Sequence, residues 1–272
     1  IYWALRLKGL RATPLQTEFK GYSALIVIVT PLLLIGLWRL STSWRVSSAI
    51  GIIQFAAITW MSSNRAAIAG FLVMAMALSV AQMFRPAYRK MAVGIAGGVI
   101  AILVGVIVWL HTSRIKIATT RAPEGDWLFP VWLIDFQRQT VWSFTLNIWE
   151  RAPWLGVGPN TINFSPGANA PMPGDEKLHI IPSHPHNWVV ELLAETGAIG
   201  FLILAAAIGF VGYRWIHWYA RSGDIAVMGA LLIFTGYWGS GLFNFSYWSA
   251  WWQLSLFMAC AIALSHVCKT KN

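Results

Sequence analysis

The sequence predicts an all-α integral membrane protein, in which about seven spanning helices form a bundle and one long, partly helical loop joins two of them. The composition predicts the membrane location. Hydrophobic residues make up 57% of the 272 residues and charged residues only 11%, whereas soluble domains carry charge at about a quarter of their positions. The mean hydropathy of +0.59 agrees. Apolar runs of spanning length then predict the number of helices.

A helix needs ~20 mostly apolar residues to cross the hydrocarbon core of a bilayer. The second and third runs are separate spans, because a single helix would stretch roughly 57 Å at 1.5 Å per residue, which is too long. The polar sequence Ser62-Ser63-Asn64-Arg65 marks the break between them. We treat residues 1–272 as one membrane domain, with spans at about 22–38, 46–61, 66–84, 91–110, 188–213, 225–243 and 248–266.

The formal net charge of +10 reflects membrane topology rather than nucleic-acid binding. Basic residues collect in short loops that share one side if the spans alternate, and the positive-inside rule makes that side cytoplasmic. The loop at residues 111–187 then faces the opposite side. Four basic residues before the first span oppose the pattern. The cytoplasmic set is Arg39, Arg45, Arg85, Arg89, Lys90, Arg214, Arg221, Lys269 and Lys271, and the opposing set is Arg6, Lys8, Arg11 and Lys20.

The first residues of the chain and its two cysteines are not part of the predicted site. The chain opens at Ile1 without methionine, and Ile1–Leu5 resemble the tail of an apolar segment. We therefore expect a longer protein with more chain upstream, the alternative being a short amphipathic surface helix. A signal peptide is not expected, since no small-residue cleavage site follows a short apolar core. Cys260 and Cys268 have no metal-type spacing and are predicted to be packing residues.

The loop at residues 111–187 holds most of the acidic residues and has a pattern of its own. Apolar residues from Asp135 to Glu150 indicate an amphipathic helix that Pro153 ends, and Gly156–Asn160 is predicted to be a turn. A folded loop of this length between two spans is uncommon unless it is functional. We therefore expect it to hold substrate over a membrane-embedded site.

Three features of the sequence suit an anionic substrate on the loop side. Arg65 stands where a helix begins at the membrane surface, where a charge is costly without a partner or ligand. Arg138 lies in the loop helix. His184 and His186 precede a helix that begins at about Asn187, and a helix N-terminus favours anions. Two guanidinium groups suit a pyrophosphate, and a histidine can accept a proton from an attacking hydroxyl near neutral pH.

Each of these residues also has a simpler interpretation. Arg65 is then a headgroup anchor, and Arg138 pairs with Asp135 across one helical turn. His184 or His186 then bonds only to loop carbonyls. A zinc site that adds His179 or Glu176 to the two histidines is a weak alternative, because the spacing and the ligand count are poor. The two glycines of the predicted turn are too few for a phosphate-loop signature.

A set of short motifs occurs in a fixed order along the chain and resembles the O-antigen ligase superfamily, which also contains O-antigen polymerases and bacterial protein O-oligosaccharyltransferases. The resemblance covers roughly residues 22–266, and members usually have more spans upstream. The motifs are Ser63-Asn64-Arg65-Ala66-Ala67, Arg138-Gln139-Thr140-Val141-Trp142, Pro153-Trp154-Leu155-Gly156-Val157-Gly158, His184-Pro185-His186-Asn187 and Glu195-Thr196-Gly197-Ala198-Ile199-Gly200.

The resemblance implies a glycosyltransferase at the periplasmic face of the bacterial inner membrane. Such an enzyme moves a glycan from undecaprenyl diphosphate to a sugar of the lipid A-core acceptor, with no metal and no other cofactor. By the same resemblance, Arg65 and Arg138 bind the diphosphate. His186, which matches the family's histidine before asparagine, acts as base or orients the acceptor hydroxyl. The further substrate-binding candidates are His184, Asn187 and Glu195.

One helix face carries two acids whose role stays open. Glu191 and Glu195 are four residues apart and share that face, so one of them can orient a histidine or an arginine. The sequence Glu195-Thr196-Gly197 can equally serve packing that holds the histidines in place.

Several other functions compete with the ligase interpretation. Polymerisation of O-antigen or exopolysaccharide repeats and glycan transfer to protein share the donor chemistry and differ only in the acceptor. A transporter for anions or lipid-linked sugars would favour charges near mid-membrane and internal repeats. Here the polar residues gather at one face without a repeat, which favours catalysis at the surface. A structural membrane subunit would leave the loop and its histidines unexplained.

Overall fold

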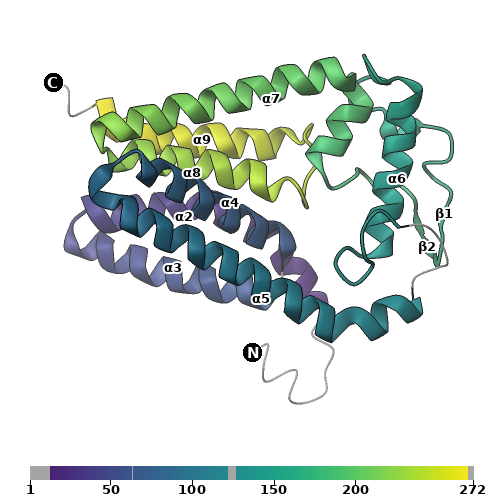
Figure 1. The fold of residues 1–272 in the computed structure, drawn as a ribbon, viewed down its shortest axis with the longest axis horizontal. Helices are drawn as coiled ribbons and strands as arrows, with labels where there is room; N and C mark the ends of the chain where they lie inside the picture. The colour runs from purple at the N-terminus through teal and green to yellow at the C-terminus, as the bar shows by residue number, and fades with distance from the viewer. Residues whose placement is uncertain (1–12, 63, 122–126, 269–272) are drawn as a thin grey trace. The chain divides into compact units, whose positions relative to one another are not determined.

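The computed structural model describes residues 13–62, 64–121 and 127–268, and most of them are helical (Figure 1). The all-α prediction is confirmed, with the addition of one small hairpin. The chain divides into two compact units. The predictions made for Ile1–Leu5, Arg6, Lys8, Arg11, Ser63, Lys269 and Lys271 fall outside the described residues.

The first unit is a helix bundle that contains the described residues up to Ala96, Phe210–Asn244 and those from Ala250 onward. Most side chains of α8 are buried, and this helix packs against α2, α4 and α9. α2 also packs along α3. The elements are α2 (Thr13–Arg39), α3 (Thr42–Ser62), α4 (Arg65–Met83), the 3-10 helix η1 (Pro86–Tyr88), the start of α5 (Arg89–Arg121), the end of α7 (Trp188–Ser222), α8 (Ile225–Ser240) and α9 (Ala250–Cys268).

Glycines let α8 approach its neighbours closely. A Cβ placed at Gly236 would lie 2.9 Å from Cγ1 of Val27, and one at Gly239 would lie 2.7 Å from Cβ of Val73. Small residues give such close contact between helices in lipid, where hydrophobicity alone does not drive association. A Cβ placed at Gly94, Gly97 or Gly98 of α5 would instead meet no atom of the described chain within 4 Å.

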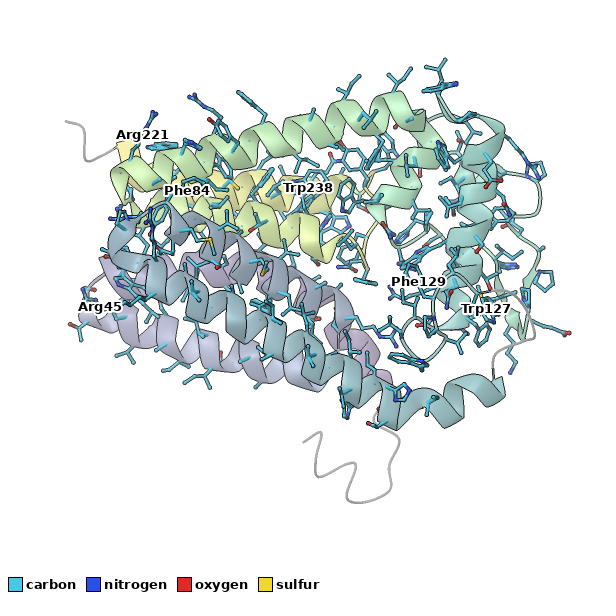
Figure 2. The ribbon with its side chains drawn as sticks, in the orientation of Figure 1. Arg45, Phe84, Trp127, Phe129, Arg221 and Trp238 are labelled. Carbon is cyan, nitrogen blue, oxygen red and sulfur yellow. The ribbon has the colours of Figure 1, made fainter. Side chains whose placement is uncertain are left out.

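Polar contacts tie several helix ends together at one end of this unit. Arg39, at the end of α2, pairs with Asp224, which caps α8. The Tyr219 hydroxyl of α7 accepts hydrogen bonds from Nε2 of Gln82 in the last turn of α4 (2.8 Å) and from Nη1 of Arg85, which lies between α4 and η1 (3.3 Å). Arg39 and Arg85, two of the basic residues predicted to share one side of the membrane, therefore lie at one end of this unit, and Figure 2 shows Arg45 and Arg221 at the same end.

The apolar runs expected to span the membrane all form helices. Within the residues that the structure describes, four helices are long and apolar enough to cross a membrane, namely Tyr22–Arg39, Arg65–Met83, Pro86–Ser113 and Trp188–Ser222. Ile225–Ser240 and Ala250–Ser265 are shorter apolar helices. The predicted break is confirmed, because α3 ends at Ser62 and α4 begins at Arg65. The described chain is thus α-helical with several membrane-type helices.

The second unit contains Gly97–Gly209 and Phe245–Ser249. α5 continues as a helix to Arg121, about ten residues beyond its apolar run. The predicted loop helix is confirmed as α6 (Phe136–Arg151), capped by Asp135. It is followed by the 3-10 helix η2 (Ile162–Phe164) and by an antiparallel hairpin of β1 (Pro171–Met172) and β2 (Asp175–His179), which the sequence analysis did not predict. The unit also contains the first part of α7, which breaks its helical geometry at Gly197.

Candidate active site

The segment that carries the two histidines has an unusual backbone. His186 has φ of +55°, in the left-handed region, which few residues other than glycine adopt and which costs on the order of 1–2 kcal/mol. The rings of His184 and His186 lie with their centroids 4.1 Å apart. Nδ1 of His184 lies 2.9 Å from Oγ of Ser183. The neighbouring chain must therefore hold this conformation against its local preference.

Contacts on both sides hold the segment. Pro185, between the two histidines, is fully buried, and its carbonyl accepts a hydrogen bond of 3.1 Å from Nε1 of Trp142 in α6. On the other side, Oδ1 of Asn187 accepts from the backbone N–H groups of Val189 (3.0 Å) and Val190 (3.5 Å). Asn187 is therefore the N-cap of α7, which places the histidines directly before a helix N-terminus.

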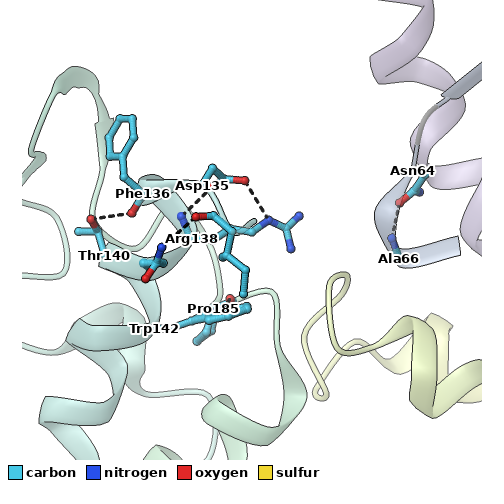
Figure 3. Close-up of polar contacts among 10 residues, drawn as sticks. Asn64, Ala66, Asp135, Phe136, Arg138, Thr140, Trp142 and Pro185 are labelled. Carbon is cyan, nitrogen blue, oxygen red and sulfur yellow. Dashed lines mark hydrogen bonds and ion pairs between the residues drawn. The ribbon is translucent and has the colours of Figure 1, made fainter. Parts of the chain in front are cut away.

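Arg138 lies one helical turn from Trp142 on α6, so the two side chains share a face (Figure 3). Oδ1 of Asp135 accepts from the backbone N–H of Arg138 (3.0 Å), and Oδ2 lies 3.9 Å from its Nε. The predicted pairing across one turn is confirmed. Both side chains are about a quarter exposed, and an ion pair of this kind contributes little stability. The ion pair orients the guanidinium on the same face of α6 as Trp142, whose indole N–H is hydrogen-bonded to the histidine segment.

Arg65 belongs to the first unit and is the first residue of α4, as the sequence predicts. The buried Asn64 side chain caps this helix: Oδ1 accepts from the N–H of Ala66 (2.9 Å), and Nδ2 donates to Oγ of Ser23 (2.7 Å). The Arg65 side chain is exposed. An exposed cation at a helix N-terminus has the positive end of the helix dipole beside it, which suits an anionic ligand.

The two acids on α7 are each 2% exposed and bind other parts of the chain. Glu191 accepts from Oγ of Ser246 (2.5 Å) and from the backbone N–H of Tyr247 (2.7 Å). Both partners belong to the turn between α8 and α9. Burial raises the pKa of the Tyr247 phenol above its ordinary value, so that side chain stays protonated at neutral pH.

Glu195 binds two further segments. Its carboxylate accepts from the backbone N–H groups of Asn160 (2.8 Å) and Ile162 (3.2 Å), and from the indole N–H of Trp248. Buried carboxylates of this kind need such donors because an unpaired buried charge is costly. The two acids therefore connect the start of α7 to residues 160–162 and to the turn at 246–248. These partners of Glu191 and Glu195 could not be predicted from the sequence.

The two glycine motifs form one structure around the break in α7. Gly197 has φ of +66° and ψ of −177°, and a Cβ there would lie 2.2 Å from the carbonyl carbon of Trp154. A Cβ at Gly156 would lie 2.3 Å from the carbonyl carbon of Glu195. Backbone hydrogen bonds join the segments, from the N–H of Ala198 to the carbonyl of Pro153 (2.8 Å) and from the N–H of Gly158 to the carbonyl of Glu195 (2.9 Å). This is the packing role that the sequence analysis left open for Glu195-Thr196-Gly197.

The zinc alternative finds no support within residues 13–62, 64–121 and 127–268. No group of three or more His, Cys, Asp or Glu side chains there has an arrangement that could hold a metal ion. Nδ1 of His179 lies 2.8 Å from the carbonyl oxygen of Asn169.

The candidate site offers two imidazoles, a guanidinium and a helix N-terminus, which can bind an anion and move one proton.

Comparison with known proteins agrees with these motifs. The family model described as O-antigen ligase matches residues 52–205. Three Rickettsia relatives carry the name "putative polysaccharide ligase". The R. prowazekii protein is 28% identical over 182 residues, 58% of this chain and 42% of its own length. The R. felis protein is 27% identical over 175 residues (57% and 42%), and the R. bellii protein 25% over 121 (43% and 29%). The chain thus covers less than half the length of these relatives.

Proposed function

The chain belongs to the O-antigen ligase family, and from that premise we propose that it is a membrane-embedded glycosyltransferase that joins an O-antigen glycan to lipid A-core. The donor in this proposal is the glycan on undecaprenyl diphosphate, and the reaction takes place at the periplasmic face of the bacterial inner membrane. The name carried by the Rickettsia relatives, polysaccharide ligase, agrees with the coarser part of this proposal.

The proposed topology has seven spans in one membrane domain of residues 1–272, with residues 111–187 as the periplasmic loop between the fourth and fifth spans. The clustering of Arg39 and Arg85 at one end of the bundle supports a cytoplasmic face there. In this proposal α3 and the shorter apolar helices α8 and α9, of 16 and 19 residues, are the remaining three spans.

One observation carries the site proposal: the His184–His186 segment is held in a strained conformation between Trp142 of α6 and the N-terminus of α7. Backbone strain of this kind gathers at functional sites. Arg138 shares the α6 face that holds the segment, so a cation, an imidazole pair and a helix N-terminus belong to one constellation in the second unit.

The proposed reaction is a displacement at the anomeric carbon of the donor sugar. The acceptor hydroxyl attacks that carbon and gives its proton to the imidazole of His186, while the bond to the diphosphate oxygen breaks. The departing diphosphate takes the electron pair, and Arg138 and Arg65 neutralise its charge. Diphosphate is a good leaving group, so catalysis consists mainly of positioning, charge stabilisation and one proton transfer.

The remaining candidates have supporting roles in the proposal. His184, whose ring lies beside that of His186, contacts the donor or the acceptor sugar. Asn187 caps α7 and so directs the helix N-terminus toward the anion. Glu195 shapes the substrate surface by holding residues 160–162. Arg65 enters the proposal through its motif and its exposed place at the start of α4.

The test is glycan transfer from the undecaprenyl diphosphate donor to lipid A-core by the His186→Ala variant. We expect the rate to fall by ~10²–10⁴-fold, the usual contribution of a general base, with donor binding less affected. His179→Ala is the matched control, because His179 is an exposed histidine on β2 of the same unit. Undiminished transfer by His186→Ala would refute the assignment. Activity should also survive a chelator, whereas a zinc enzyme would lose it.

A second experiment separates ligation from polymerisation, which share the donor. Cells that lack a ligase keep polymerised glycan on the lipid carrier, whereas cells that lack a polymerase make no polymer. The expected result is polymerised, carrier-linked glycan.

A further inference from the structure

Two large apolar side chains stand at the tip of the segment Pro153–Gly158 in the second unit. Trp154 is 68% exposed and Leu155 is 75% exposed. The backbone beneath them is firmly held, because the N–H of Ala198 donates to the carbonyl of Pro153 (2.8 Å) and that of Ile199 to the carbonyl of Trp154 (3.3 Å). The tip therefore presents its side chains outward from a fixed base.

The tip continues an exposed apolar face of α7. Ile199, Leu202 and Ile203 are 46%, 62% and 67% exposed, and their spacing places them on one side of the helix. α7 is long and apolar enough to cross a membrane. The hydrogen bond from Ile199 to Trp154 therefore joins the tip to a helix face that suits lipid.

The length of α7 determines the level in the bilayer at which the tip lies. From Ala198 to Arg221 the helix rises ~35 Å at 1.5 Å per residue, compared with a hydrocarbon core of ~30 Å. With Arg221 at one interface, Ile199 reaches the other, and so does the tip bound to it. Tryptophan prefers this level of a bilayer. Residues 152–174 contain no charged side chain whose desolvation would oppose a place at this level of the bilayer.

We propose that Trp154 and Leu155 insert into the lipid interface and anchor the Pro153–Gly158 segment to the membrane. The occupant of this apolar surface is bilayer lipid rather than a glycan. A sugar-binding platform needs hydrogen-bonding side chains beside its aromatic ring, but the exposed neighbours of Trp154 on the tip are Leu155 and Val157. This anchor does not depend on the reaction. It keeps the end of α6 and the break in α7 at the height of the lipid headgroups.

The test is a spin label on Leu155→Cys in the whole protein, in a Cys260→Ala, Cys268→Ala background, in vesicles of phosphatidylethanolamine and phosphatidylglycerol. The accessibility of the label to oxygen is compared with its accessibility to a water-soluble nickel complex. Leu202→Cys marks the lipid-facing surface and Lys177→Cys, on exposed β2, marks water. We expect the ratio at position 155 to be close to that at 202 and well above that at 177. A ratio equal to that at 177 would overturn the anchor.

A second measurement leaves the natural cysteines in place. A photoreactive p-benzoylphenylalanine at position 155 should form adducts with phospholipid, whereas the same group at position 177 should not. Mass spectrometry identifies the adduct. Adducts with glycan or with another protein, and none with lipid, would show that the tip docks a different partner and would overturn the proposal.

Discussion

The break in α7 can be tested by placing a single methyl group at Gly197. Its φ and ψ of +66° and −177° are accessible essentially only to glycine, and the added Cβ would lie 2.2 Å from the backbone of Trp154. In Gly197→Ala the chain must leave this conformation, at about 1–3 kcal/mol. It must also displace Pro153–Gly158 and weaken two backbone hydrogen bonds of about 0.5–1.5 kcal/mol each. We expect a loss of about 2–6 kcal/mol in the free energy of unfolding.

Gly209→Ala is the matched control, because Gly209 lies in the same helix with no atom of the described chain within 4 Å of its added Cβ. There alanine should stabilise by about 0.4–1 kcal/mol, since it reduces the freedom of the unfolded chain. The assay is thermal unfolding in detergent, followed by circular dichroism at one fixed scan rate. We expect Tm to fall by roughly 5–20 °C in Gly197→Ala. Equal Tm values for the two variants would refute the conclusion that Gly197 is required by its contact with the Trp154 backbone.

Three further predictions concern the contacts around the site. Glu195→Gln sets an amide N–H2 group against donors that now bind a carboxylate. The free energy of unfolding should fall by about 1–3 kcal/mol, which is measured as a lower Tm. The control Glu176→Gln, on exposed β2, should leave Tm unchanged. Trp142→Phe removes the donor to the Pro185 carbonyl and should lower kcat more than it raises KM; an unaltered kcat would argue against a positioning role. Asn187→Ala should cost about 1 kcal/mol through the lost N-cap, and Asn187→Asp, which keeps the cap, should restore Tm; failure to restore it would show that the amide is needed for more than capping.

The helices could be predicted from the sequence because each needs a long apolar run to enter lipid. Their ends were predicted less well. α5 runs to Arg121 and α7 to Ser222, about ten residues past the apolar runs. Hydropathy marks where lipid ends, whereas a helix continues into water as long as its backbone hydrogen bonds are satisfied. Within α5, Thr112 and Ser113 also donate to carbonyls one turn back, which is compatible with a continuing helix.

The family resemblance and the ion pair of Arg138 with Asp135 could also be predicted from the sequence. The matched region, residues 52–205, confirms the family. The ion pair is confirmed because a helix fixes the distance between residues three apart. The hairpin was missed, because β1 has only two residues and β2 contains a single apolar residue, so neither strand has an alternation to detect. The roles of Arg65, Arg138 and His186 in catalysis stay predictions.

Local chemistry by itself determined which segments of this chain are helical, which enter lipid and which residue types stand at the helix starts. Only the tertiary structure decided what the buried acids do. Glu195 binds the backbone of Asn160 and Glu191 binds Ser246, partners 35 and 55 positions away. No periodicity in the sequence relates such positions, because hydrogen bonds between distant segments depend on how the chain packs. The break at Gly197 likewise has its reason in the approach of Trp154, a contact that exists only once the Pro153–Gly158 segment has packed against α7.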